Sequence, residues 1–260
     1  MTATAERKGF MPGCSLPSYT PDGVKKTMEY LKTVYPDMGG VQKCCGKGTK
    51  ALGQEEKFKE RFAGLQQDMD DIGIDTIIVA CQNCYKTINE TSETTKAESL
   101  WTLLPKIGIP EELRGKAKDS DVVFGIHDSC STRYEKELQD GVRWVLKELG
   151  YRVEESEHSR ENARCCGFGG MIVPANPDLA TRVMQRRADD FTTDHVVVYC
   201  AACRASMMKV GKKAFHILDL LWGPVVHSDT APPEDVLSKP AGAWINRYKS
   251  KRIVKQVVKS

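Results

Sequence analysis

The sequence predicts an α/β protein made of two similar Rossmann-like α/β halves related by an internal duplication. Three observations support this fold class. Short apolar segments typical of buried strands alternate with longer segments of helical periodicity. The same order of segments occurs twice. Each copy contains one set of five cysteines, and the two sets account for all ten cysteines of the chain. Strands that alternate with helices form parallel sheets through right-handed crossovers, so we expect a parallel sheet in each half.

The spacing of the cysteines supports the duplication. Corresponding cysteines are separated by similar intervals: Cys14 and Cys130 by 116 residues, Cys45 and Cys166 by 121, and Cys81 and Cys200 by 119. The flanking residues agree best around the last pair. There, residues 74–80 and 193–199 both contain an acidic residue followed by a β-branched strand that ends at a cysteine.

The predicted order of elements is the same in both halves: a strand, a helix, a Cys-Cys-Gly turn, a second helix, and a buried strand followed by Cys-x-x-Cys. In the first half we expect them at residues 9–13, 23–31, 44–46, 54–69 and 74–80. In the second half we expect them at residues 122–129, 141–149, 165–167, 178–191 and 193–199. Pro177 supports the start of the helix predicted at residues 178–191, because proline favours the first helical turn.

This order places cysteines where α/β proteins bind ligands. Open α/β sheets bind ligands in loops beyond the carboxyl ends of their strands. Four cysteines fall at such predicted strand ends: Cys14, Cys81, Cys130 and Cys200. Glycine allows a tight turn and a close approach of the backbone, so Gly46 and Gly167 are candidate cofactor-binding positions. The alternative for each glycine is ordinary turn chemistry.

The sequence further predicts three segments: a first domain at 1–117, a second at 118–228, and a basic C-terminal tail at 229–260. Residues 241–260 contain six basic residues and no acidic ones. One interpretation is a solvated terminal helix or tail. Another is a docking patch for an acidic partner subunit, with Trp244 and Tyr248 contributing, and a weaker one is association with a membrane surface.

Composition bounds the class of protein. With 40% hydrophobic and 28% charged residues, the chain suits a globular protein with a real core. The apolar runs are shorter than the roughly 20 residues of a transmembrane helix. Residues 1–8 contain no signal-peptide core, so we expect a cytoplasmic protein with reduced thiols, alone or in a membrane-associated complex. The net charge of +3 gives no indication of nucleic-acid binding, and we expect none.

The residue types point to a soft metal. Thiolates select iron–sulfur clusters or zinc over magnesium and calcium. A Cys-x-x-Cys alone fits zinc, a cluster or thioredoxin-like chemistry. Five cysteines exceed the four ligands of a structural zinc site or an ordinary cubane, and adjacent cysteines suit neighbouring metals of a larger cluster. A disulfide within each adjacent pair is the alternative.

These motifs resemble the cysteine-rich CCG domain, and two tandem copies are similar to the catalytic iron–sulfur subunit of heterodisulfide reductase. The resemblance covers about residues 9–222. It implies two noncubane [4Fe-4S] clusters, each held by one set of five cysteines. The implied ligands of the first are Cys14, Cys44, Cys45, Cys81 and Cys84. Those of the second are Cys130, Cys165, Cys166, Cys200 and Cys203.

The resemblance also implies a function. It indicates an oxidoreductase, the iron–sulfur subunit of a heterodisulfide-reductase-like complex, that acts on a small-molecule disulfide or thiol. The sequence lacks a ferredoxin-type run of cysteines and a Rossmann glycine fingerprint, so we expect a ferredoxin-like iron–sulfur subunit and a flavin-containing subunit as partners. One alternative is an electron-transfer subunit that links a flavin dehydrogenase to a quinone or other carrier. The other is a structural module with zinc at one or both sites.

A few residues beside the cysteines have two interpretations. His127 lies three residues before Cys130 and is a candidate catalytic residue that protonates a leaving thiolate, or else a structural histidine at the strand end. His195 is expected to be structural. Four basic residues offset thiolate charge or orient an anionic substrate, or else are simply solvated: Lys43, Lys47, Arg164 and Arg204.

Overall fold

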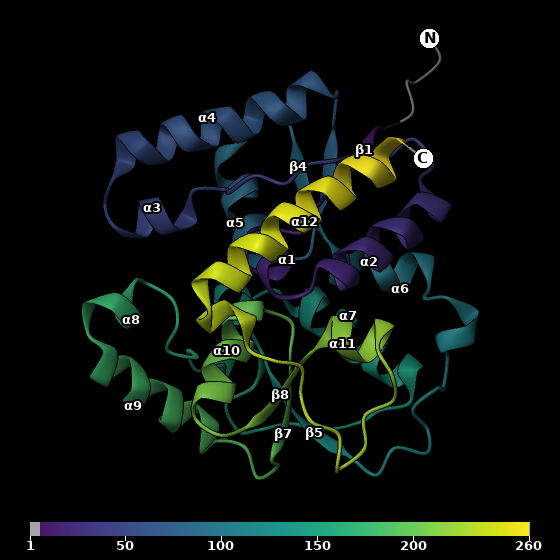
Figure 1. The fold of residues 1–260 in the computed structure, drawn as a ribbon, viewed down its shortest axis with the longest axis vertical. Helices are drawn as coiled ribbons and strands as arrows, with labels where there is room; N and C mark the ends of the chain where they lie inside the picture. Colours follow the sequence, from purple (N-terminus) through teal and green to yellow (C-terminus); the bar gives the residue numbers. More distant parts are fainter. Residues whose placement is uncertain (1–5, 260) are drawn as a thin grey trace. The chain divides into compact units, whose positions relative to one another are not determined.

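The computed structural model describes residues 6–259. Residues 1–5, part of the segment without a signal-peptide core, and residue 260, the end of the basic tail, lie outside the described residues. The chain forms two compact units, one of residues 6–100 and 241–259 and the other of residues 101–240. We describe them as unit 1 and unit 2 (Figure 1).

Unit 1 contains a four-stranded parallel sheet in the order β2-β1-β3-β4. Its strands are β1 (Lys8–Met11), β2 (Gly39–Gly40), β3 (Thr76–Val79) and β4 (Lys96–Ser99). Its helices are α1 (Ser15–Tyr19), α2 (Pro21–Val34), α3 (Lys47–Ala51), α4 (Glu55–Asp71), α5 (Gln82–Thr91) and most of α12 (Pro240–Lys259).

Unit 2 repeats this topology with the order β6-β5-β7-β8, again all parallel. Its strands are β5 (Val123–His127), β6 (Arg152–Glu154), β7 (His195–Val198) and β8 (Lys213–His216). Its α-helices are α6 (Leu100–Ile107), α7 (Lys136–Leu149), α8 (Ile172–Ala175), α9 (Pro177–Ala188), α10 (Ala201–Lys209) and α11 (Ile217–Trp222). Four short 3-10 helices lie at Glu111–Leu113, Cys130–Thr132, Arg160–Asn162 and Val236–Ser238. The predicted α/β fold with two similar halves is confirmed.

Local sequence explains where the predicted helices begin. The Thr20 hydroxyl accepts a hydrogen bond from the Gly23 amide at 3.2 Å, with Pro21 as the first residue of α2. In unit 2, the Asn176 side chain accepts from the Leu179 amide at the start of α9. Side-chain caps and an initial proline both favour a helix start, so α9 begins one residue before the predicted helix.

The core of each unit lies around its two central strands. Residues 76–79 of β3 and 195–198 of β7 are buried throughout, and helices α4 and α9 supply buried apolar side chains. Cys45 and Cys84 belong to the core cluster of unit 1, and Cys166 and Cys203 to that of unit 2. Part of each cysteine set is therefore held by the core itself.

The compact units differ from the predicted domains 1–117, 118–228 and 229–260 at two places. The first unit ends at Leu100, because the buried Trp101 in α6 packs within unit 2, where its carbonyl group lies against Gly141 of α7. Residues 241–259 belong to unit 1, where α12 lies alongside α2 (Figure 1) and Lys32 donates to the Val257 carbonyl at 2.8 Å.

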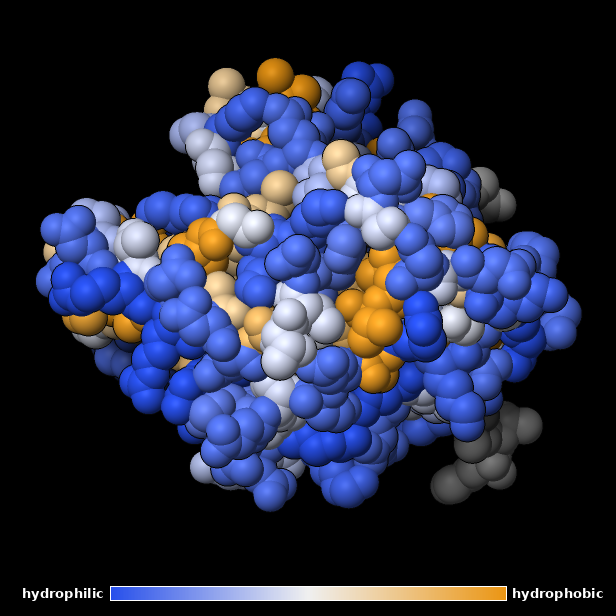
Figure 2. Space-filling view, turned by 90° about the horizontal axis from the view of Figure 1, so that it is seen from below, coloured by the Kyte–Doolittle hydropathy of each residue, from blue (hydrophilic) through white to orange (hydrophobic). Residues whose placement is uncertain are grey.

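Within residues 6–259, none of the helices combines the length and apolar character that a membrane span requires. The face of the molecule in Figure 2 is mostly hydrophilic, with hydrophobic residues in small patches.

Candidate metal centres

The turn after each adjacent cysteine pair has the same backbone geometry. Gly46 and Gly167 both have left-handed φ angles, +81° and +78°. The Gly46 amide points to Cys44 Sγ at 3.5 Å, and the Gly167 amide points to Cys165 Sγ at 3.4 Å. A Cβ at Gly46 would lie 2.8 Å from the Phe58 ring, and one at Gly167 would lie 2.9 Å from the Ala180 carbonyl oxygen. Both positions therefore need glycine for backbone angle and for space.

The remaining cysteines of each set lie at the carboxyl edge of the parallel sheet. In unit 1, Cys14 follows β1, Cys81 precedes α5, and Cys84 lies in the first turn of α5. In unit 2 the same places are taken by Cys130 after β5, Cys200 before α10 and Cys203 in α10. The adjacent strands β1 and β3, like β5 and β7, run parallel, so their carboxyl ends deliver these thiols to one edge.

The five thiols of unit 1 interact in two groups, one of Cys14 and Cys44 and one of Cys45, Cys81 and Cys84. Cys14 contacts Cys44, Cys45 contacts Cys84, and Cys84 contacts Cys81 through side-chain hydrogen bonds. The hydrogen bond from Cys14, with help from the Gly46 amide and the charges of Arg247 and Arg61, lowers the pKa of Cys44 to about 5. The geometry therefore favours a thiolate at this position at neutral pH.

The five thiols of unit 2 form one connected group. Cys130 contacts Cys165, Cys165 contacts Cys166, and Cys203 contacts both Cys166 and Cys200. Hydrogen bonds from Cys130 and Cys166 and from the Gly167 amide lower the pKa of Cys165 to about 2. A hydrogen bond from Cys203 lowers the pKa of Cys200 to about 7. Cys165 is the most exposed member of either set.

The donor atoms fit an iron–sulfur group. All ten cysteines are free thiols, and each unit gathers five of them at one edge. The hydrogen bonds within each set hold some of these groups as thiolates, the form that binds metal. Five soft donors at one place exceed the four that a closed zinc site uses. When bound, such a cluster supplies electrons one at a time.

His127 ends β5 and is 1% exposed. Its Nδ1 accepts a hydrogen bond from Nε of Arg187 at 2.8 Å. Burial, together with the Arg187 charge, lowers the pKa of His127 to about 3, so the ring is neutral at neutral pH. This geometry agrees with a structural role, and proton transfer by His127 stays a prediction.

The basic residues beside the cysteines make specific contacts. Lys43 binds the Gly64 carbonyl oxygen at 2.6 Å and the Asp68 carboxylate at 2.9 Å. Arg164 pairs with Asp190 at 2.6 Å, and the buried Arg204 donates to the Pro233 carbonyl oxygen. Arg164 and Arg204 therefore bind other groups of the protein and are not simply solvated.

His195 is a buried residue of β7, as expected of a structural histidine. Its ring stacks on Phe215 at 6.3 Å between centroids and meets Phe124 edge-on at 5.9 Å.

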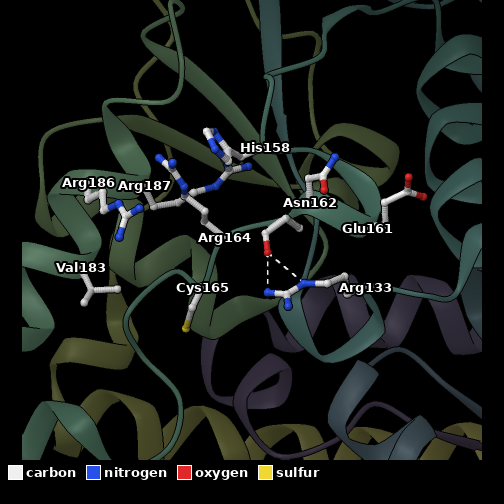
Figure 3. Close-up of a pocket in the computed structure, with 10 residues that line it drawn as sticks. Arg133, His158, Glu161, Asn162, Arg164, Cys165, Val183, Arg186 and Arg187 are labelled. Atoms are coloured by element: carbon white, nitrogen blue, oxygen red, sulfur yellow. Dashed lines mark hydrogen bonds between the residues drawn. The ribbon is translucent and has the colours of Figure 1, made fainter.

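A cavity of about 450 Å³, which no sequence motif predicted, lies beside Cys165 (Figure 3). Four arginines line it: Arg133, Arg164, Arg186 and Arg187. Among the described residues that line it, Glu161 is the one acidic residue. Arg133 holds the Ala163 carbonyl oxygen with Nε and one terminal nitrogen, which leaves its other N–H groups available. In the sequence, the adjacent Arg186 and Arg187 could have indicated this cavity. Only the position of α9 in the fold shows that they lie beside Cys165.

A parallel α/β unit that gathers five thiols at one sheet edge, present twice in one chain, defines a duplicated thiolate metal-binding protein. A model of the family described as "Cysteine-rich domain" (CCG) matches residues 9–89 and 124–208, together more than half of the chain. The chain belongs to the CCG cysteine-rich domain family, with two copies in tandem. The predicted resemblance is thereby confirmed.

Curated relatives are similar at low identity. The EtfAB:quinone oxidoreductase of Syntrophomonas wolfei is 26% identical over 71% of this chain and 29% of its own length. A subunit of the fumarate reductase (CoM/CoB) of Methanothermobacter marburgensis is 25% identical over 83% of this chain and 46% of its own length. A subunit of the dihydromethanophenazine:CoB–CoM heterodisulfide reductase of Methanosarcina acetivorans is 25% identical over 68% of this chain and 46% of its own length. The matches thus span less than half of each of these relatives.

Among solved structures, the aspartate racemase of Picrophilus torridus is similar with a TM-score of 0.35 and 13% identity over 95% of each chain. A likeness of this degree carries no functional argument.

Proposed function

We propose that this chain is an iron–sulfur oxidoreductase subunit of the heterodisulfide-reductase type, with one noncubane [4Fe-4S] cluster in each unit. The observation that carries the proposal is the gathering of five thiols, twice, at the carboxyl edge of a parallel sheet. Relatives named as oxidoreductase subunits, and one named an uncharacterized iron-sulfur protein, support the same class. Gly46 and Gly167 would place the backbone against the clusters.

We place the substrate in the cavity beside Cys165. A small-molecule disulfide accepts two electrons and two protons and yields two thiols, so its reduction needs an external electron source. A ferredoxin-like iron–sulfur subunit and a flavin-containing subunit would provide it. Guanidinium groups bind carboxylate, sulfonate or phosphate with charge-assisted hydrogen bonds, so the cavity favours a disulfide with an anionic end.

The first experiment measures iron, zinc and acid-labile sulfide in anaerobically purified protein. Two four-iron clusters give about eight irons and eight sulfides per chain. Brown protein with this content supports the proposal. Colourless protein with zinc and no sulfide overturns it in favour of the structural zinc module.

The second experiment tests the substrate with a chemical reductant as electron donor. Arg186 is exposed and lines the cavity, whereas Arg182, on the same helix, is exposed and is not among the lining residues. We expect Arg186→Gln to lower kcat/KM for an anionic disulfide about tenfold, the effect of about 1.4 kcal/mol, and to leave a neutral disulfide unaffected. Arg182→Gln is the matched control. Equal effects of both variants would contradict this placement.

A second candidate is an electron-transfer subunit that serves a flavin dehydrogenase and a quinone or other carrier. The match to a relative named EtfAB:quinone oxidoreductase favours it. Two clusters that exchange electrons with a carrier but reduce none of a panel of disulfides would establish this alternative.

A further inference from the structure

A buried ring nitrogen of His127 lies beside the unit 2 cysteines. His127 Nε2 makes no hydrogen bond with any group in residues 6–259. A ring nitrogen of His127 and the sulfurs of Cys166 and Cys203 all lie within 4.8 Å of one another. The other ring nitrogen, Nδ1, is occupied by Arg187, so Nε2 is the nitrogen free to act on the sulfurs. Buried polar groups without a partner are rare, and this one borders the proposed ligands.

Arg187 decides which ring nitrogen carries the proton. A guanidinium group has only donors, so the Arg187 Nε–H requires an unprotonated Nδ1 on His127. A neutral imidazole holds one proton, which must then be on Nε2. The side chain of His127 therefore presents an N–H group, and not a lone pair, on the side away from Arg187.

The position of Arg187 is itself fixed. Its side chain is fully buried, and its NH1 group donates to Asp190 at 2.9 Å and to Ser156 at 3.2 Å. Its guanidinium carbon lies 4.2 Å from the centroid of the Phe191 ring. These contacts fix the position of the Arg187 guanidinium group. The fold therefore determines which tautomer His127 adopts.

The hydrogen bond from Arg187 to His127 differs from the one that a metal-ligating histidine normally makes. A histidine that ligates a metal normally donates its second ring N–H to an oxygen acceptor. His127 does the reverse, because its second ring nitrogen accepts from a cation. We propose that His127 donates Nε2–H to the cysteine sulfurs of the unit 2 site, with Arg187 as the positioning residue, and so raises the reduction potential of that cluster. The inference rests on the proposed function, since it assumes a cluster at this site.

In the described residues of unit 1, the positions that correspond to His127 and Arg187 are occupied by apolar side chains. Met11 ends β1 and precedes Cys14 by three residues, as His127 ends β5 and precedes Cys130 by three. On α4, the fully buried Leu65 lies 20 residues after Cys45, whereas Arg187 lies 21 residues after Cys166. Met11 and Leu65 belong to the apolar core of unit 1. Hydrogen bonds to the sulfurs stabilise the added electron, so the unit 2 cluster should be the easier of the two to reduce.

The test is an EPR-monitored redox titration of the cluster-loaded protein and three variants. His127→Met removes the N–H group and copies the unit 1 residue, whereas His127→Gln keeps a side-chain N–H donor. At a fixed potential we expect His127→Met to lower the ratio of reduced to oxidised unit 2 cluster about tenfold, a shift of roughly 59 mV for one electron. His127→Gln should restore most of the shift. The control Met11→Leu should leave the unit 2 cluster unchanged.

Pulsed EPR with ¹⁵N-histidine supplies a second readout. Donation through N–H···S predicts weak nitrogen coupling to the cluster, and a strong coupling typical of a directly bound nitrogen would overturn the proposal. An unchanged potential in His127→Met, with full iron content, would overturn it as well. Absence of iron and sulfide from the unmodified protein would instead refute the proposed function, so the two failures are distinguishable.

Discussion

Among individual residues, the buried Asp128 beside the unit 2 thiols is paired with groups distant in sequence. Asp128 is fully buried and accepts two hydrogen bonds from Arg143, at 3.0 and 2.8 Å, and one from the Arg160 amide at 2.8 Å. The Tyr199 hydroxyl also binds it, at 3.1 Å. This network fixes the loop between β5 and Cys130, and with it the first cysteine of the set.

Arg143→Met tests this network, because it leaves the Asp128 carboxylate buried without its main counter-charge. We expect a loss of roughly 3–5 kcal/mol in the free energy of unfolding, the cost of breaking a buried pair from one side. Chemical denaturation measures it. Lys136→Met, on the same helix and 81% exposed, is the control and should change stability by less than about 0.5 kcal/mol. Equal free energies of unfolding for the two variants would show that water reaches Asp128.

At the element scale, the turn after each cysteine pair decides whether adjacent thiols can face one site. A left-handed glycine reverses the chain and aims its amide at the preceding sulfur. In unit 2 the turn also packs against α9, where Met184 Cγ would lie 2.9 Å from a Cβ at position 167. The turn and the helix are thus fitted to each other.

Gly167→Ala should disturb this fit, whereas Gly169→Ala should not. Gly167 has a positive φ and no room for a Cβ, whereas a Cβ at Gly169 meets nothing within 4 Å. We expect Gly167→Ala to cost about 1–3 kcal/mol of stability and to lower the iron content of unit 2. Denaturation and iron analysis of both variants measure these effects. A Gly169→Ala variant that loses as much iron would contradict the specific role of Gly167.

At the scale of the whole molecule, each unit places thiols in its core, where they take up space that apolar side chains would otherwise fill. A bound cluster would join the strand ends, the turn and the following helix of a unit through its ligands. Metal binding that needs the folded site adds its free energy to folding.

Removal of the clusters by oxidation and chelation should therefore lower the thermal midpoint. A loss of a few kcal/mol corresponds to a decrease of about 5–10 °C for a chain of this size. Calorimetry before and after removal measures the change, and anaerobic reconstitution with iron and sulfide should reverse it. An unchanged midpoint would show that the cysteine sets fold without a contribution from metal.

Features that depend on neighbours along the chain follow from the amino-acid sequence alone. Alternating strands and helices, the cysteine after each central strand and the Cys-Cys-Gly turns all follow from local periodicity and residue type. Those signals predicted the fold and the grouping of the cysteines into two sets. Strand ends shifted by a few residues, since β5 ends at His127 where the prediction extended to residue 129.

Features that join distant segments depend on the three-dimensional packing. Arg187 meets His127 across 60 residues, and Arg133 lines the same cavity as Arg186. Likewise, α12 packs Val254 and Val257 into unit 1, more than 200 residues after α2. A side chain's partner depends on how helices pack on the sheet. A local pattern of residues indicates periodicity but does not indicate which distant surface the segment contacts.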